Sequence, residues 1–173
     1  MQVCNGLYYE KNTNFLTFIN SEYNIKWEIL KVCENYTLIK NNKIDIEIVN
    51  PRKLHKYMKK FIDNTIDKAH GCKIPDECFI SKNTKTLFIL EKKFQKVSGS
   101  VCEKIQTSDF KIWHYTRLFP SWKIIYIYCL SDWFKENCKE ELEYLKFKKV
   151  DVFFGEKSDY FFKLSEYFIN YFN

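Results

Sequence analysis

Apolar residues occur along this chain in short runs separated by polar turns, and the clearest pair of runs lies near the middle. Residues 86–90 form a nearly continuous run of apolar and β-forming side chains, which is typical of a buried central strand. Residues 78–80 form a shorter run before it, and the polar segment 81–84 supplies turn-forming residues between the two. This pattern predicts a β-hairpin in the interior of the protein.

Helices and further strands are predicted on both sides of the hairpin. Apolar residues recur at helical spacing from Leu54 to Ala69, which predicts a helix that begins at Pro51 and ends at Gly71. After the hairpin, the pattern predicts a helix over 100–119, a buried strand over 122–129, a helix from Ser131 to about Lys146, a strand over 150–154 and a last helix from Ser158 to about Phe172. The segments 7–9, 15–19, 27–32, 36–38 and 44–49 indicate short strands or mixed elements, the last two as a hairpin.

This order of elements favours the α/β class, with a central mixed β-sheet flanked by helices. The 173 residues are 46% hydrophobic, which is enough to bury a sizeable core, and the sequence contains no long linker and no internal repeat. We therefore expect one domain over residues 1–173. Its core spans roughly 50–130, and a helix-strand-helix extension covers 131–173.

Two carboxylates and one lysine stand at the open end of the predicted hairpin. Pro75-Asp76 precedes the first strand, and Glu91-Lys92-Lys93 ends the second. Because successive side chains of a strand point to opposite faces, Glu91 and Lys93 share one face. Mg²⁺ prefers oxygen ligands and is usually held by one or two carboxylates together with substrate phosphates. We therefore predict that Asp76 and Glu91 bind Mg²⁺, with Mn²⁺ as an alternative, and that Lys93 assists the attacking water or stabilises charge on the phosphate.

The same residues, followed by a polar turn with a glycine and by a helix, resemble the motif of the PD-(D/E)xK nuclease superfamily, and most of all its type II restriction endonucleases. The resemblance covers roughly residues 50–130 and implies a restriction-endonuclease-like core. It implies that Asp76 and Glu91 are the metal ligands and Lys93 is the catalytic lysine, and it adds Gln106 on the following helix as a further active-site residue. The implied function is Mg²⁺-dependent, site-specific cleavage of double-stranded DNA by an endodeoxyribonuclease.

The motif residues are also consistent with less specific roles. Pro-Asp is a common turn dipeptide, and Glu-x-Lys occurs by chance in a lysine-rich chain, so both groups also fit solvated strand ends. Within the same chemistry, a DNA repair nuclease or a Holliday-junction resolvase is the nearest alternative. A nucleic-acid-binding module without catalysis is the alternative from a different class.

Basic residues gather on the helix predicted after Pro51. The cluster consists of Arg52, Lys53, Lys56, Lys59 and Lys60. With a net charge of +6, this face is predicted to contact DNA phosphates, and a solvated lysine-rich face is the alternative. Asp63 and Asp67 on the same helix are candidates either for a third acidic ligand or for local ion pairs with neighbouring lysines.

Seven cysteines without a Cys-x-x-Cys pair, and no apolar run long enough to span a bilayer, predict a cytoplasmic protein with reduced, partly buried thiols. A restriction-type function further implies a prokaryotic source. His70, Cys72 and Cys78 carry suitable ligand atoms for zinc, but the sequence offers no obvious fourth ligand nearby.

The last predicted helix is apolar over more than one narrow stripe. Packing against the neighbouring strand explains this width, and a surface for a partner is the alternative. Since a two-fold arrangement of active sites allows both strands of a palindromic site to be cut, the expected activity favours a homodimer.

Overall fold

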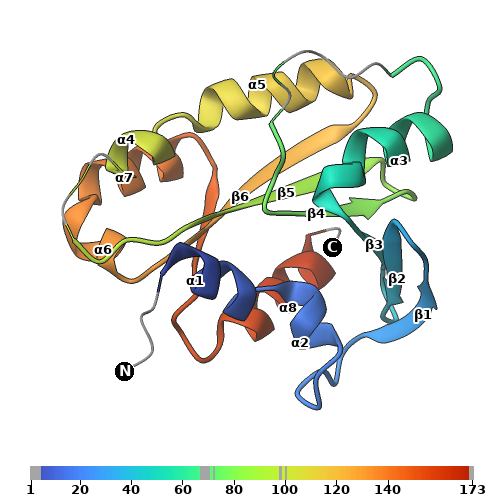
Figure 1. Cartoon of the computed structure of the whole chain (residues 1–173), viewed down its shortest axis with the longest axis horizontal. Coiled ribbons are helices and arrows are strands. Elements are labelled where there is room, and N and C mark those ends of the chain that lie inside the picture. The colour runs from blue at the N-terminus through green and yellow to red at the C-terminus, as the bar shows by residue number, and fades with distance from the viewer. Residues whose placement is uncertain (1–4, 67–70, 72, 98, 100, 172–173) are drawn as a thin grey trace.

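Seven strands follow one another across one mixed β-sheet in the same order as in the chain (Figure 1). The computed structural model describes residues 5–66, 71, 73–97, 99 and 101–171. The strands are β1 (Glu28–Val32), β2 (Tyr36–Lys40), β3 (Asp45–Val49), β4 (Glu77–Ser81), β5 (Thr86–Lys93), β6 (Lys123–Leu130) and β7 (Asp151–Phe154). Neighbours from β1 to β5 are antiparallel, whereas β5, β6 and β7 run parallel. The predicted α/β domain with a central mixed sheet is confirmed.

Helices cover both faces of the sheet and enclose an apolar layer on each (Figure 1). They are α1 (Gly6–Asn12), α2 (Phe15–Ile19), α3 (Leu54–Phe61), α4 (Val101–Ile105), α5 (Ser108–Leu118), α6 (Trp133–Asn137), α7 (Lys139–Phe147) and α8 (Tyr160–Asn170), with a 3-10 turn η1 (Pro51–Lys53) before α3. Buried residues of α3 to α7 belong to one layer, and those of α1, α2 and α8 belong to the other.

The predicted hairpin is β4 and β5, which are paired antiparallel from Glu77 opposite Leu90 to Ser81 opposite Thr86. Every residue of β4 and the first five residues of β5 are buried, which explains the continuous apolar run in the sequence. Side chains alternate along β5 between the two layers, so that Ile89 packs on the side of α5 and Leu90 on the side of α8. This alternation sets the direction of every polar side chain at the end of β5.

The helix predicted from Pro51 to Gly71 is too long, because α3 ends at Phe61. The side chain of Asp63 accepts hydrogen bonds from the backbone N–H and the hydroxyl of Thr65, at 2.9 Å and 2.6 Å. Such a local side-chain turn competes with continued helix and explains the early end. Asp67, Ala69, His70 and Cys72 lie outside the described residues, so the ligand roles considered for them are not addressed by the structure.

Two further helices are divided where one helix was predicted. The segment 100–119 contains α4 and α5, and the hydroxyl of Thr107 between them donates to the carbonyl of Lys104 at 2.8 Å. The segment from Ser131 contains α6 and α7, which meet at Cys138 with non-helical backbone torsions. In both places a residue outside helical geometry lets the chain turn while each short helix keeps its buried face.

A disulfide joins Cys102 of α4 to Cys138, with the Cα atoms 5.9 Å apart. The prediction that all thiols are reduced is therefore wrong for this pair. The two residues are 36 positions apart in the sequence, and only the packing of α4 beside the α6–α7 junction brings them together. Cys33, Cys78 and Cys129 are free thiols.

Short helices replace two of the segments that were predicted to be short strands or mixed elements near the N-terminus. Asn5 and Asn14 each accept a hydrogen bond from a backbone N–H three residues later, which caps α1 and α2. The apolar runs in these segments are too short to distinguish strand from helix. The predicted hairpin of 36–38 with 44–49 is confirmed as β2 and β3.

The wide apolar surface of α8 is largely explained by packing within the chain. Phe168 is buried and lies against Phe15, Phe79 and Phe88, with ring centroids 4.8 to 5.5 Å apart. In the described part of the chain, no helix has both the length and the apolar character needed to span a bilayer.

Candidate active site

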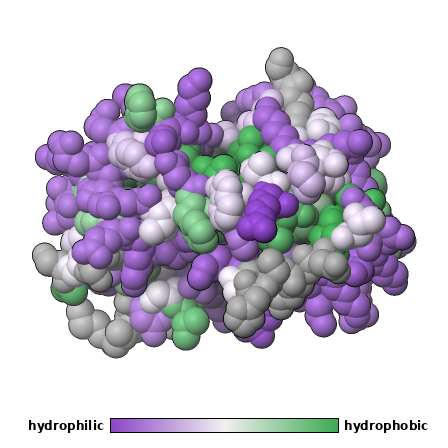
Figure 2. All heavy atoms as spheres, turned by 90° about the horizontal axis from the view of Figure 1, so that it is seen from above, coloured by the Kyte–Doolittle hydropathy of each residue, from purple (hydrophilic) through white to green (hydrophobic). Residues whose placement is uncertain are grey.

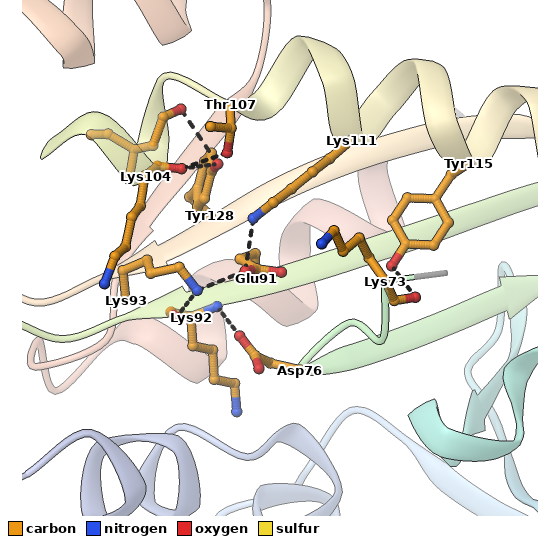
Figure 3. A network of polar contacts seen from close by, with 11 residues as sticks. Lys73, Asp76, Glu91, Lys92, Lys93, Lys104, Thr107, Lys111, Tyr115 and Tyr128 are labelled. Carbon is orange, nitrogen blue, oxygen red and sulfur yellow. Dashed lines mark hydrogen bonds and ion pairs between the residues drawn. The ribbon is translucent and has the colours of Figure 1, made fainter. Parts of the chain in front are cut away.

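Asp76, Glu91 and Lys93 meet at one end of the sheet (Figure 3). Asp76 immediately precedes β4, and its carboxylate oxygen Oδ2 accepts a hydrogen bond of 2.6 Å from the backbone N–H of Lys92 in β5. The Lys93 ammonium donates to Oε1 of Glu91 at 2.6 Å. The antiparallel pairing of β4 and β5 therefore places the three residues together as the strand alternation predicts.

A second lysine reaches the same carboxylate from α5. The Lys111 ammonium lies 2.9 Å from Oε1 of Glu91, the oxygen that Lys93 also contacts (Figure 3). The side chains of Glu91, Lys93 and Lys111 are only 15%, 20% and 15% exposed. Sequence reasoning missed Lys111, although it precedes the buried Tyr115 by one helical turn and so lies near the face of α5 that meets the sheet.

Gln106 does not join this group. It lies between α4 and α5, and its side-chain amide donates to Oε1 of Glu141 in α7 at 3.2 Å. The residue of the following helix that contacts Glu91 is instead Lys111, five positions after Gln106. Because the predicted helix is divided at Thr107, Gln106 turns toward α7, whereas Lys111 on α5 faces Glu91.

The two carboxyl groups experience opposite shifts in pKa. Burial raises the pKa of Asp76, the hydrogen bond from Lys92 opposes this shift, and the negative charges of Glu91 and Glu10 add to it. Burial also favours the neutral form of Glu91, but the charges of Lys93 and Lys111 outweigh it, and the pKa of Glu91 lies below its ordinary value. Glu91 is therefore the more readily ionised of the two.

The negative charge of Glu10 is a small contribution to the raised pKa of Asp76, and the sequence pattern had not singled out this residue. Glu10 belongs to α1, on the opposite side of the sheet from Lys111, and its backbone carbonyl accepts a hydrogen bond of 3.0 Å from the Lys92 ammonium. Its position in a short helix, far from the motif in sequence, gave no signal.

The donor set fits a hard divalent cation. Asp76, Glu91 and Glu10 offer only oxygen atoms, the ligands that Mg²⁺ and Mn²⁺ prefer. The negative charges of Glu91 and Glu10 contribute to the raised pKa of Asp76, and a cation beside Asp76 would oppose that shift. Asp76 and Glu91 could therefore hold such an ion together.

Zinc has no obvious site among the described residues, and Asp76, Glu91 and Glu10 also do not bring three ligand atoms within 4.8 Å of one another. Within the described residues, only Cys102, Cys138 and Glu141 bring three candidate ligand atoms within 4.8 Å of one another, and the disulfide occupies both sulfurs. The thiol of Cys78 is buried and donates to the carbonyl of Val49, and burial raises its pKa. A buried neutral thiol of this kind is a poor metal ligand.

The surroundings of the site are rich in cations. Lys73 and Lys104 are exposed, and Figure 3 shows their side chains on either side of the group formed by Glu91, Lys93 and Lys111. Seen from the side of α5, the surface is mostly hydrophilic with smaller hydrophobic patches (Figure 2). A negatively charged ligand therefore meets a favourable electrostatic field around the carboxylates.

The predicted DNA-binding residues lie on η1 and α3. Arg52, Lys56 and Lys60 are exposed, and Lys53 is partly exposed. Pro51, at the start of η1, lines the same cavity of about 290 Å³ as Asp76. The basic segment therefore begins near Asp76.

Comparison with models of known protein families found no match, and comparisons with curated proteins and with solved structures found none either. The functional inference therefore rests on the geometry of the chain itself.

Proposed function

We propose that this protein is a Mg²⁺-dependent endonuclease that hydrolyses phosphodiester bonds in double-stranded DNA, of the type II restriction kind. One observation carries the proposal: β5 ends with Glu91 and Lys93 on one face, and the hydrogen bond from Lys92 holds Asp76 beside them. The order of elements around this hairpin supports it. An antiparallel β3–β4–β5 unit, a helical connection and a parallel β6 are what we expect of a restriction-endonuclease-like core.

Asp76 and Glu91 would hold the ion in this proposal, and Mn²⁺ would be accepted as well. When bound, a divalent cation supplies Lewis-acid polarisation of the phosphate and a more acidic water. The protein contributes the fixed positions of the two carboxylates, since Asp76 is restrained by a backbone N–H and Glu91 by two ammonium groups.

The two lysines have distinct parts in the proposed reaction. Lys93 and Lys111 place two positive charges on one carboxylate oxygen, so one charge remains in excess when Glu91 is ionised. Lys93, on the strand beside the carboxylates, orients the attacking water. Lys111, which arrives from α5 across the site, stabilises negative charge that develops on the scissile phosphate.

Substrate affinity is proposed to come from the basic face of η1 and α3, together with Lys73 and Lys104 near the site. These contacts attract the phosphate backbone without reading its sequence. A homodimer that presents two such sites is part of the proposal, because a duplex has two strands to cut.

The test is cleavage of unmethylated plasmid and long linear duplex DNA by the purified protein with Mg²⁺ or Mn²⁺. We expect discrete bands that disappear with EDTA and in Lys93→Ala. Lys31→Ala, which removes an exposed lysine on the edge strand β1, is the matched control and should cut normally. Failure of the unaltered protein to cut any duplex or branched DNA with either ion would contradict the proposal.

A repair nuclease or a junction resolvase would use the same residues, and the same assay separates these functions. Cutting confined to four-way or branched substrates would favour the resolvase or the repair enzyme. Salt-sensitive binding without cutting would favour a non-catalytic module.

A further inference from the structure

A row of aromatic side chains runs along the exposed face of α5. Phe110 and Trp113 are 54% and 52% exposed, and their ring centroids lie 5.7 Å apart. The ring of His114 stacks on that of Phe110 with centroids 6.1 Å apart, and the guanidinium of Arg117 lies over the Trp113 ring, 5.6 Å from its centroid. These residues occupy positions i, i+3, i+4 and i+7 of the helix, so they form one continuous surface, the α5 aromatic row.

The α5 aromatic row is not part of the interior of the fold. The opposite face of α5 packs on the sheet through Tyr115, which is 1% exposed. Phe110 and Trp113 belong to neither of the two apolar layers. Exposed apolar side chains that adjoin one another, unlike scattered ones, often mark a binding surface. A partner is therefore a better explanation of this row than packing within the chain.

Positive charge lies beside the row and indicates an anionic partner. Arg117 and Lys73 are both exposed, and the carbonyl of Lys73 accepts a hydrogen bond of 3.2 Å from the Tyr115 hydroxyl, which holds Lys73 against α5 (Figure 3). The acidic residue of α5 is Asp109, and its carboxylate is already paired with the Lys148 ammonium at 2.7 Å. The row therefore combines flat apolar rings with cations.

We propose that the α5 aromatic row binds unpaired nucleotides of a DNA strand, with bases stacked on Phe110 and Trp113 and a phosphate paired with Arg117. Aromatic rings stack on every base and neighbouring cations attract the phosphates, which is how many proteins hold single-stranded DNA. A second copy of this chain fits less well, because it would present the same positive charge rather than a complementary one.

The proposal rests on the proposed nuclease function for the place of these nucleotides in the substrate. Lys111, which contacts Glu91, directly follows Phe110 in α5, so a strand bound along the row passes close to the carboxylates. The substrate is then a duplex with unpaired nucleotides beside the scissile bond. Binding of those nucleotides by the row requires neither a metal ion nor cleavage.

The test measures binding of a fluorescein-labelled duplex that carries a single-stranded thymidine tail, by fluorescence anisotropy with EDTA present so that nothing is cut. The unaltered full-length protein should bind the tailed duplex more tightly than a blunt duplex. We expect Trp113→Ala and Phe110→Ala each to bind the tailed duplex about 5- to 100-fold more weakly and the blunt duplex as before. Both side chains are exposed, so the thermal midpoint of each variant should match that of the unaltered protein.

Two controls separate base stacking from other effects. A tail with the same phosphates but no bases should bind equally well to Trp113→Ala and to the unaltered protein. Phe147→Ala, which removes a ring that is 79% exposed on α7, should bind every substrate normally. Equal affinities of Trp113→Ala and Phe147→Ala for the thymidine tail, or an equal loss on the tail without bases, would overturn the proposal. A dimer that Trp113→Ala abolishes without any change in tail binding would assign the row to a second copy instead.

This proposal and the nuclease function fail in different ways. If the protein binds the thymidine tail through Trp113 but cuts no DNA, the nuclease function is wrong and the nucleotide-binding surface stands. If the protein cuts DNA and the variants of the row bind and cut as the unaltered protein does, the nuclease function stands and the row has no part in substrate binding.

Discussion

The Lys111 ammonium of α5 and the Glu91 carboxylate of β5 are in direct contact at 2.9 Å, across the space that separates the helix from the end of the sheet. This contact joins the strand that carries the motif to the helix that follows it. It also gives Glu91 a second cation beside Lys93, which lowers the pKa of the carboxyl group against the effect of burial.

Replacing Lys111 tests whether this contact serves the reaction. Lys111→Met should slow cleavage by about 100-fold under single-turnover conditions, because a positive charge near the scissile phosphate is lost. Lys111→Arg keeps the charge and should retain more activity. A rate for Lys111→Met equal to that of Lys31→Met, the surface control, would assign Lys111 a structural role only.

Asp76→Asn should make the metal-free protein more stable. A buried carboxyl group with a raised pKa binds more protons in the folded chain than in the unfolded chain, so stability falls as the pH rises through the range above the ordinary value for aspartate. The amide carries no charge and can still accept the hydrogen bond from Lys92. We expect the thermal midpoint at neutral pH to rise by roughly 2–4 °C, or about 1 kcal/mol.

The pH dependence provides the check on this prediction. The difference between Asp76→Asn and the unaltered protein should vanish in acid, where the aspartate is protonated in both states. Added Mg²⁺ should raise the midpoint of the unaltered protein and leave that of Asp76→Asn unchanged. If Asp76→Asn is instead less stable than the unaltered protein at neutral pH, the prediction is wrong, because the folded protein then favours the charged carboxylate.

The disulfide between Cys102 and Cys138 should contribute roughly 3–4 kcal/mol to the free energy of unfolding, from a separation of 36 residues. Cys102→Ser should therefore shift the urea midpoint downward, and a reducing agent should have the same effect on the unaltered protein. Cys33→Ser is the control, since Cys33 is a free thiol. Equal midpoints with and without reductant would contradict the prediction.

The hydrogen bond from Tyr57 to Glu47 should be important for stability. Tyr57 is 1% exposed, and the Glu47 carboxylate that accepts its hydroxyl hydrogen is also paired with Lys82 at 3.0 Å. Tyr57→Phe leaves a buried carboxylate oxygen without this donor, which costs about 1–3 kcal/mol. Tyr144→Phe removes an exposed hydrogen bond to Asp109 and should cost much less in the same chemical denaturation experiment.

DNA binding should depend on salt through the basic face. Arg52→Ala combined with Lys56→Ala should reduce the slope of log affinity against log salt by about two, if each residue contacts one phosphate. The variant Lys31→Ala/Lys43→Ala removes the same charge elsewhere and should keep the slope. Equal slopes for both variants would place the DNA on another surface.

The β4–β5 hairpin was predictable because its apolar runs in the sequence coincide with its buried residues in the structure. The β4–β5 hairpin is buried on both faces, so its sequence is largely apolar, and the period of two then fixes the directions of Glu91 and Lys93. The strands β2, β3, β6 and β7 were also found within a few residues.

The rest depended on contacts between segments far apart in the chain. Lys111 and Glu10 approach the hairpin from helices on opposite sides, and no spacing within the sequence encodes their distance from Glu91 or Asp76. The disulfide partners, the end of α3 and the break between α4 and α5 depend in the same way on packing and on single side-chain turns, such as that of Asp63 with Thr65.

The change from antiparallel to parallel pairing at β5 has a consequence for how the chain folds. Asp76 and Glu91 come together within one hairpin, a short-range event, whereas Lys111 reaches Glu91 only when α5 packs during the longer crossover to β6. Short loops close faster than long ones and cost less entropy. Pulsed hydrogen-exchange labelling should therefore find β4 and β5 protected before α5. Asp76 and Glu91 would then come together before α5 brings the positive charge of Lys111 to Glu91.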